Sequence, residues 1–294
     1  MKRQKVKKGI ILAGGRGTRF YPFTFYTSKH LLPINDKPIV YYPIANFIKN
    51  GIKKILIISD KKYLKDYIKL LGSGKKFGIT INYKVQKKPN GLPEALLLGE
   101  KFVNKKPFAL NLGDHILFGR DVDKILLKNF NNYKNNTIFT INHSNTKEYG
   151  VLEKNLNNKK TQIIEKPKNT KSKRIVVGIY IYNYEAIQLA KKLKPSKRNE
   201  LEITDLNNML IRNEKLIIEK FPNKKNFWFD AGDAAKVHKI SNLIKNYEKK
   251  NKKQVANLDE IALLKRLIKK KKFLKEIKFK KGSYYEYLKK KYEN

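Results

Sequence analysis

The chain has 294 residues, no cysteine and a formal net charge of +42 at pH 7. Its length is sufficient to bury a large core, while the lack of cysteine excludes disulfide frameworks and thiolate metal sites and agrees with a reducing compartment. Because no apolar run approaches the roughly 18 residues of a membrane-spanning helix, we expect a cytoplasmic protein with no membrane partner.

Short apolar runs alternate with helical patterns in the first part of the chain. Three runs predict strands buried on both faces, over 9–13, 55–59 and 107–112, and helical periodicity predicts helices over 39–50 and 92–102. This alternation is typical of an α/β fold in which helices wrap a mostly parallel, Rossmann-like sheet. Ligands of such a sheet bind at the carboxyl ends of its strands.

The middle and the end of the chain depart from this pattern. From residue 234 the pattern is helical, and we expect a main domain over 1–250 followed by a Lys-rich helical appendage over 251–294. Before it, strands alternating with polar turns predict a β-rich region over the same cleft, at 137–141, 151–153, 161–164 and 175–182.

The first predicted strand runs directly into a glycine-rich basic turn, Gly14-Gly15-Arg16-Gly17-Thr18-Arg19. Because glycine lacks Cβ, the backbone N–H groups of such a turn can approach a polyphosphate, and Arg16 and Arg19 supply guanidinium groups that match its oxygens. The turn is not a dinucleotide fingerprint, since Phe20 stands where that motif has its third glycine. Glycine also serves ordinary chain reversal, so the turn alone leaves both interpretations open.

Further residues extend this turn into a longer pattern. Residues 14–24, with Phe20 in place of leucine, then 29–33 and Lys37-Pro38 match the pattern G-G-x-G-T-R-L-x-P-x-T, K-x-L-L-P and K-P of sugar-nucleotide pyrophosphorylases. The chain resembles this nucleotidyltransferase family, and most of all its short-form glucose-1-phosphate thymidylyltransferases. The similarity continues through Leu112-Gly113-Asp114, Glu165-Lys166-Pro167, 200–205 and 228–232.

The resemblance implies a transferase of nucleotide-sugar and polysaccharide biosynthesis, which makes dTDP-glucose and pyrophosphate from dTTP and glucose 1-phosphate. An oxygen of the sugar phosphate attacks the α-phosphorus in line, so positioning and charge neutralisation do most of the catalysis. Because both reactants are highly anionic, such a site needs cations and a hard metal ion, usually Mg²⁺, held by carboxylates. A homo-oligomer, with the tetramer among its expected forms, is also implied.

Two other functions stay open beside this one. A transferase that uses UTP or another sugar 1-phosphate would need the same phosphate-binding residues, so the resemblance does not separate these substrates. Some members of the family are catalytically silent regulatory subunits, and the retained cations and carboxylates of this chain argue against that function.

The resemblance implies the roles of individual residues from their matching positions. Asp114 and Asp230 fall on the two positions whose carboxylates hold the metal ion, although an aspartate alone at either place would be interpreted as a turn or cap residue. Arg19 and Lys29 match the cations that grip the triphosphate and neutralise the leaving pyrophosphate. With Lys166, which is implied to bind the sugar phosphate, they form the predicted catalytic set.

The remaining site residues are also implied by position. Nucleotide binding is assigned to Leu12, Gly14, Gly15, Gly17, Thr18, Gln86 and Gly91, of which Gln86 and Gly91 match positions that read the pyrimidine edge. Binding of the sugar phosphate is assigned to Gly150, Glu165, Lys166, Val176 and Tyr180, with Glu165 accepting hydrogen bonds from sugar hydroxyls. An apolar Val or Tyr is equally expected in a core, and Gln86 on a strand could be solvated.

Three positions depart from the family pattern. His115 replaces the asparagine that usually follows the metal aspartate, Asp233 replaces a threonine, and Pro93-Glu94 replaces a small residue and a glutamine. None of them removes a phosphate or metal ligand, so they bear on nucleotide choice and on the shape of the pocket. His115 offers a general base or a metal ligand, but an ionised phosphate nucleophile needs no base, and we expect a structural or supporting role.

The charge of +42 also raises the possibility of a nucleic-acid partner, because Lys-rich surfaces bind phosphate backbones by counterion release. The lysines are spread along the chain together with abundant Asn, Ile, Tyr and Phe, which are all residues with A/T-rich codons. Genome composition is therefore sufficient to explain the charge, and a partner is not required by it. We expect nonspecific affinity for polyanions at low salt and no specific nucleic-acid partner.

Overall fold

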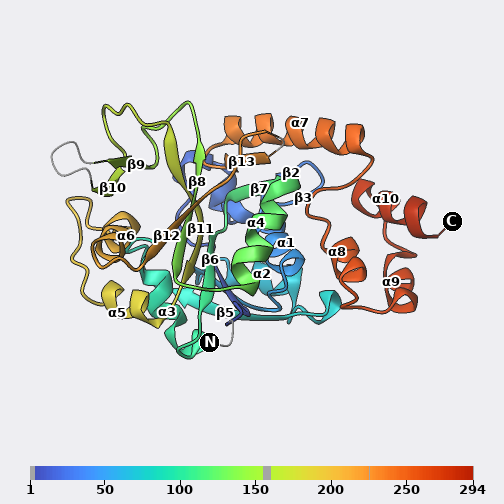
Figure 1. Ribbon diagram of the computed structural model, residues 1–294. Helices are drawn as coiled ribbons and strands as arrows, with labels where there is room; N and C mark the ends of the chain where they lie inside the picture. Colours follow the sequence, from blue (N-terminus) through green and yellow to red (C-terminus); the bar gives the residue numbers. More distant parts are fainter. Residues whose placement is uncertain (1–3, 155–159, 225, 294) are drawn as a thin grey trace.

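The structure is a computed structural model that describes residues 4–154, 160–224 and 226–293. These residues form a nine-stranded sheet in the order β10-β9-β11-β6-β1-β4-β5, with β8 paired to β11 and β12 paired to β8. Figure 1 shows this sheet running through the molecule with helices along it. The strands β6-β1-β4-β5 are parallel, with bounds β1 (Lys8–Leu12), β4 (Lys54–Asp60), β5 (Thr80–Gln86) and β6 (Phe108–Leu112).

Helices cover both faces of the parallel strands. Successive side chains of a strand point to opposite faces, and Ile10 belongs to a core cluster with Leu96, whereas Ile11 belongs to a second cluster with Phe47. Burial on both faces explains why these strands are continuous apolar runs, as the sequence predicted. The first cluster includes α3 (Glu94–Val103), α5 (Tyr184–Ala190) and α6 (Ile203–Arg212), and the second includes α1 (Tyr41–Lys49), α2 (Leu64–Leu71), α4 (Arg120–Asn131) and α7 (Ala234–Asn251).

The predicted β-rich region is continuous with the central sheet. Strand β11 (Arg174–Tyr182) pairs antiparallel with β6 near its end and with β9 (Gly150–Lys154) near its start, and β8 (Asn136–Asn142) pairs antiparallel along its opposite edge. Strand β10 (Thr161–Glu165) pairs with β9, and β12 (Leu216–Lys220) pairs parallel with β8. The sequence predicted most of these strands, and their connection to the parallel strands through β11 is a finding of the structure.

A separate ribbon of two strands begins next to the end of β6. Strand β7 (His115–Gly119) pairs antiparallel with β13 (Asn226–Asp230), so that His115 lies opposite Asp230. The inward side chains of both strands are buried in the cluster that contains α1 and α4. This pairing brings the end of β13 beside Asp114, which directly precedes β7.

The chain between β1 and α1 is built of short turns at the same end of the sheet. It contains the 3₁₀ turns η1 (Thr18–Phe20), η2 (Phe23–Phe25) and η3 (Lys29–Leu31) and the hairpin of β2 (Pro33–Ile34) and β3 (Lys37–Pro38). A further 3₁₀ turn, η4 (Lys75–Phe77), precedes β5. Among the described residues, no helix combines the length and the apolar character that crossing a bilayer requires.

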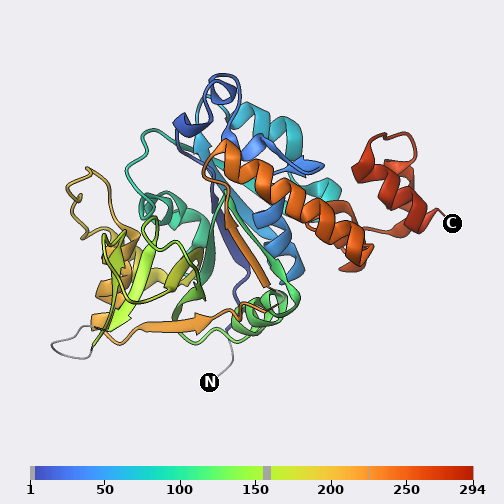
Figure 2. The same ribbon diagram turned by 90° about the horizontal axis from the view of Figure 1, so that it is seen from above.

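The C-terminal helices α8 (Leu258–Leu264), α9 (Lys270–Ile277) and α10 (Ser283–Tyr292) lie together at one side of the molecule (Figure 2). The carboxylate of Glu260 is buried between them and accepts hydrogen bonds from Tyr287 Oη at 2.9 Å, Lys291 Nζ at 2.7 Å and Tyr292 Oη at 3.0 Å. Helix α8 also packs against α1. One buried acid thus ties α10 to α8 and, through α8, to the main body.

We expect Glu260→Ala to lower the free energy of unfolding by about 1–3 kcal/mol, because it leaves the three donors of α10 without their acceptor. Urea denaturation measures the change. The control is Glu286→Ala on α10, whose exposed carboxylate lies 3.6 Å from Lys289 Nζ and should contribute well under about 1 kcal/mol. Equal losses in the two variants would contradict the role of Glu260.

Candidate active site

A cavity of about 320 Å³ opens at the carboxyl ends of β1 and β6. Ligands of a mostly parallel sheet bind at this end of the strands, as expected from the sequence. Most of the predicted site residues line it, namely Leu12, Gly14, Arg19, Lys29, Asp114, Gly150, Glu165, Lys166, Val176, Tyr180 and Asp230. Segments that are far apart in the sequence therefore meet around one cavity.

The glycine-rich turn forms the wall at the end of β1. Gly17 has φ of +60°, and a Cβ there would lie 3.0 Å from Thr24 Cγ2, so an L side chain would be strained. Thr24 Oγ1 donates to Gly17 O at 2.7 Å and closes the turn. Three of the predicted nucleotide-binding residues, Gly15, Gly17 and Thr18, do not line this cavity. The contacts of Gly17 with Thr24 stabilise the conformation of the turn.

Asp114 and Asp230 come together through the β7–β13 ribbon. Candidate ligand atoms of Asp114, His115 and Asp230 all lie within 4.8 Å of one another. The backbone N–H of Ala231 donates to Asp114 O at 3.1 Å, which fixes the two segments side by side. Two carboxylates at this separation offer hard oxygen donors, and such a donor set fits a divalent cation of the Mg²⁺ type.

Lys29 provides the positive charge closest to these carboxylates. Its Nζ lies 2.5 Å from Asp114 Oδ2. Burial raises the pKa of the Asp114 carboxyl, but the charges of Lys29, His115 and His30 together with the hydrogen bond from Lys29 outweigh burial, and the net pKa lies below its usual range. Asp114 is therefore ionised at neutral pH, as a metal ligand must be.

Arg19 and Asp230 approach each other over Gly232. A Cβ at Gly232 would lie 3.3 Å from Arg19 Nη1 and 3.1 Å from Asp230 Oδ2, so the absence of a side chain leaves room for both groups. Lys236 Nζ lies 3.7 Å from Asp230 Oδ2 and 2.6 Å from Glu148 Oε2. The carboxylate side of the cavity is thus surrounded by cations.

His115 is held as a hydrogen-bond acceptor. Its Nδ1 accepts from the backbone N–H of Gly178 at 2.9 Å and from Trp228 Nε1 at 3.1 Å. Two donors on one nitrogen mean that Nδ1 carries no proton, so in the neutral ring the proton lies on Nε2 and neither nitrogen is free to ligate a metal. His115 therefore links β7, β11 and β13, in agreement with the expected structural role, and metal binding is left to the two carboxylates.

The other end of the cavity is formed by β9, β10 and α6. Glu165, at the end of β10, accepts from Thr204 Oγ1 at 2.6 Å and lies 3.6 Å from Arg198 Nη2. Lys166 follows with φ of +45°, an uncommon value for a residue with a side chain, and its N–H donates to Tyr149 O at 3.1 Å. The chain bends sharply here, and both side chains lie on the wall of the cavity.

Several residues of this site were not predicted from the sequence. Glu148 and Tyr149 line the cavity, and their position next to the matched Gly150 was the only available signal. Arg198 lies 2.7 Å from Glu202 Oε2 as well as close to Glu165, and it precedes the matched segment 200–205. These residues gain their importance from contacts that only the folded chain creates.

Gln86 and Gly91 lie behind the cavity wall. Gln86 ends β5 and is only 5% exposed, and a Cβ at Gly14 would overlap its side-chain oxygen. Gly91 has φ of +98° and forms a bridge with Leu201, whose backbone occupies the place of any Cβ. Neither residue lines the cavity of about 320 Å³, and Gln86 reaches its wall through Gly14.

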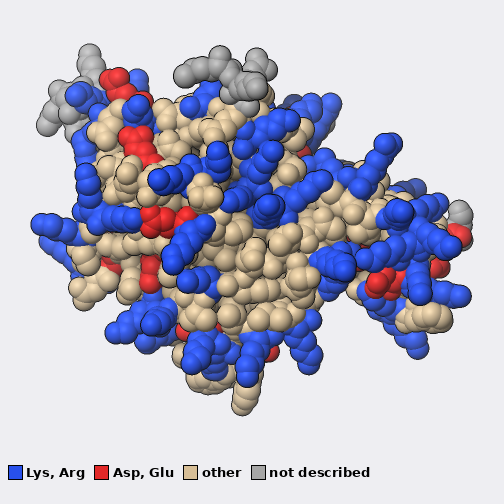
Figure 3. Space-filling view, turned by 90° about the horizontal axis from the view of Figure 1, so that it is seen from below, with Lys and Arg blue, Asp and Glu red and all other residues tan. Residues whose placement is uncertain are grey.

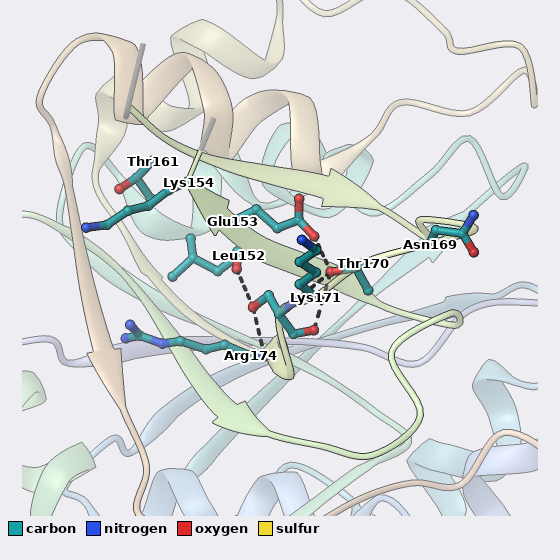
Figure 4. Close-up of a pocket in the computed structure, with 9 residues that line it drawn as sticks. Leu152, Glu153, Lys154, Thr161, Asn169, Thr170, Lys171 and Arg174 are labelled. Carbon is teal, nitrogen blue, oxygen red and sulfur yellow. Dashed lines mark hydrogen bonds between the residues drawn. The ribbon is translucent and has the colours of Figure 1, made fainter. Parts of the chain in front are cut away.

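A larger cavity of about 740 Å³ lies between β9, β10 and the turn that leads into β11. Figure 4 shows Lys154, Lys171 and Arg174 around it, with Glu153 hydrogen bonded to Thr170. None of the predicted site residues lines this cavity, and Glu153 is its one acidic lining residue in the described part of the chain. It therefore offers no paired carboxylates for a metal ion.

Comparison with known proteins gives a consistent result. Residues 8–247 match the family model described as nucleotidyl transferase. A glucose-1-phosphate thymidylyltransferase of Neisseria meningitidis is 39% identical over 255 residues, covering 87% of this chain and 88% of the relative. The enzyme of the same description from Xanthomonas campestris is 40% identical over 256 residues, covering 87% and 86%.

Solved structures agree in fold as well as in sequence. A structure from Bacillus anthracis, assigned as a glucose-1-phosphate thymidylyltransferase, has a TM-score of 0.72 and 36% identity, covering 80% of this chain and 94% of its own. The structure of a UDP-glucose pyrophosphorylase complexed with UDP-glucose has a TM-score of 0.70 and 25% identity, covering 83% and 99%.

Proposed function

This chain belongs to the nucleotidyl transferase family, and on that premise we propose that it transfers a thymidylyl group from dTTP to glucose 1-phosphate with release of pyrophosphate. The observation that carries the proposal is the cavity itself. It gathers two carboxylates, Asp114 and Asp230, together with the cations Arg19, Lys29 and Lys166. Two anionic substrates can react only where such charges offset their repulsion.

The proposed roles follow from where each side chain lies. Asp114 and Asp230 would hold Mg²⁺, which when bound neutralises phosphate charge. Arg19 and Lys29, which line the cavity beside these carboxylates, bind the triphosphate and stabilise the negative charge that develops on pyrophosphate. Lys166 and Glu165, at the other end, bind the phosphate and a hydroxyl group of the sugar. The phosphate nucleophile is already ionised, so no residue has to remove a proton.

The division of the chain is part of the same proposal. Every described residue that lines the cavity precedes residue 250, so we assign catalysis to 1–250 and regard 251–294 as an appendage outside the chemistry. We also propose that copies of the chain form a homo-oligomer. Sedimentation velocity would test this by measuring the mass of the protein in solution.

The substrates are tested by measuring pyrophosphate release across a matrix of nucleoside triphosphates and sugar 1-phosphates. The expected result is the highest kcat/KM with dTTP and glucose 1-phosphate. A maximum with UTP would favour the alternative of a UTP-dependent transferase, which the similarity to a UDP-glucose pyrophosphorylase supports. No release with any pair would favour a catalytically silent homologue.

A separate prediction distinguishes this function from binding of nucleic acid. Figure 3 shows Lys and Arg side chains spread across one face of the molecule instead of gathered in one patch. Lys166→Ala should weaken use of the sugar phosphate but leave DNA binding almost unchanged, because it removes one charge from a net of +42. Neutralising the exposed residues 269–272 should leave nucleotidyl transfer intact and flatten the salt dependence of DNA binding by up to about one unit per lost phosphate contact.

The two measurements are enzyme kinetics with varied glucose 1-phosphate and DNA affinity across a salt series. If the variant at 269–272 lost nucleotidyl transfer while Lys166→Ala kept it, our assignment of the active site to this cavity would be wrong.

A further inference from the structure

The side-chain amide of Gln86 is held in one orientation. Gln86 Nε2 donates to Glu94 Oε2 at 2.6 Å, and the same oxygen accepts from the backbone N–H of Asn90 at 3.2 Å. Because a carboxylate offers only acceptors, the amide nitrogen of Gln86 must face Glu94, and its oxygen must face the opposite way. The orientation of this amide follows from the chemistry of its partner.

The loop that precedes Glu94 is itself anchored. The backbone N–H of Leu201 donates to Asn90 O at 2.9 Å, and Gly91 forms a bridge with the same residue. Glu94 is the first residue of α3, so the helix fixes the position of its Cα. Gln86 therefore meets a carboxylate that is attached to rigid structure on both sides.

The oxygen of Gln86 faces the glycine-rich turn. Gln86 Oε1 lies so close to Gly14 that a Cβ on Gly14 would overlap it, and Gly14 lines the cavity. No donor among the described residues makes a hydrogen bond to this oxygen. An acceptor that has no hydrogen-bond partner in the described part of the chain therefore lies beside the predicted nucleotide-binding turn.

From these contacts we infer that Glu94 is a positioning residue for base selection, an inference that rests on the proposed function. Glu94 holds Gln86 so that the nucleotide site offers a carbonyl acceptor and withholds the amino donor. The N3–H of thymine or uracil can donate to that acceptor, whereas N3 of cytosine is itself an acceptor and is repelled. The glutamine of the family pattern, which Glu94 replaces, has both a donor and an acceptor, so it would leave the amide of Gln86 free to turn over.

The test is base selectivity in Glu94→Gln, with Glu100→Gln as the matched control on the same helix. Glu100 Oε1 accepts from Lys191 Nζ at 2.6 Å and from Tyr184 Oη at 3.0 Å, and it does not line the cavity. The quantities measured are kcat/KM for dTTP, UTP and dCTP with glucose 1-phosphate, and the Kd of each nucleotide by calorimetry. We expect Glu94→Gln to lower the preference for dTTP over dCTP by about tenfold, because the acceptor is no longer fixed.

The ratio of dTTP to UTP should stay unchanged, because both bases carry N3–H, and Glu100→Gln should change neither ratio. A Glu94→Gln protein that keeps the wild-type preference for dTTP over dCTP overturns the inference. An equal loss for all three nucleotides also overturns it, since that result marks a merely structural role. If the wild-type protein transfers no nucleotide at all, the proposed function fails, and the calorimetric affinities alone decide whether Glu94 selects the base.

Discussion

Asp114→Asn and Asp230→Asn should each lower Mg²⁺-dependent turnover by about a thousandfold. Each substitution removes one anionic ligand from an ion that is expected to supply several kcal/mol of charge stabilisation. Ligand atoms of the two residues lie within 4.8 Å of each other at the carboxylate end of the cavity, so both can bind the same ion and the loss of either weakens its binding. The measurements are kcat and the concentration of Mg²⁺ at half-maximal rate.

Two controls accompany these variants. Asp66→Asn, at an exposed position in the first turn of α2, should keep full activity. Because Asp114→Asn also leaves Lys29 without its ion-pair partner, urea denaturation must show that the variant is folded. Full activity in both folded variants would show that the metal ligands are wrongly assigned.

Arg19→Ala should lower kcat by roughly a hundredfold and change KM much less. Arg19 lines the cavity near Asp230, where pyrophosphate would leave, so its charge acts on the transition state more than on the bound substrate. Loss of one donor of this kind costs roughly 3 kcal/mol. Initial rates at varied dTTP separate kcat from KM.

The matched control is Arg16→Ala, which removes the same charge from the same turn. Arg16 is exposed and does not line the cavity, so we expect little change in kcat. An Arg19→Ala enzyme that changed only in KM would show that Arg19 binds the ground state and the transition state equally.

The sequence alone determined the central part of the fold. The apolar runs of β1, β4 and β6 and the helical periodicity of α1 and α3 predicted an α/β sheet, because burial on two faces leaves a local pattern in the chain. The glycine-rich turn could be recognised for a related reason. Positive φ at Gly17 is a requirement of the backbone itself, and only glycine meets it without strain.

The resemblance of the motifs predicted which residues form the site, and the tertiary structure decided how they meet. Lys29 and Asp114 are 85 residues apart in the chain, and His115 and Trp228 are 113 apart, yet each pair is in contact. The β7–β13 pairing that unites Asp114 and Asp230 has no local signature, since short strands of this kind can pair with many partners.

The contacts through which Glu94 and His115 act were not predicted either, because they too have no local signature in the sequence. By sequence both were only departures from a pattern, and their roles depend on which donors surround them. Nδ1 of His115 became an acceptor because Gly178 and Trp228 converge on it, and Glu94 fixed an amide because Gln86 ends the neighbouring strand. Local periodicity and backbone requirements depend on residues that are neighbours in the sequence, whereas the orientation of a hydrogen-bonding group is set by partners that only the folded chain brings together.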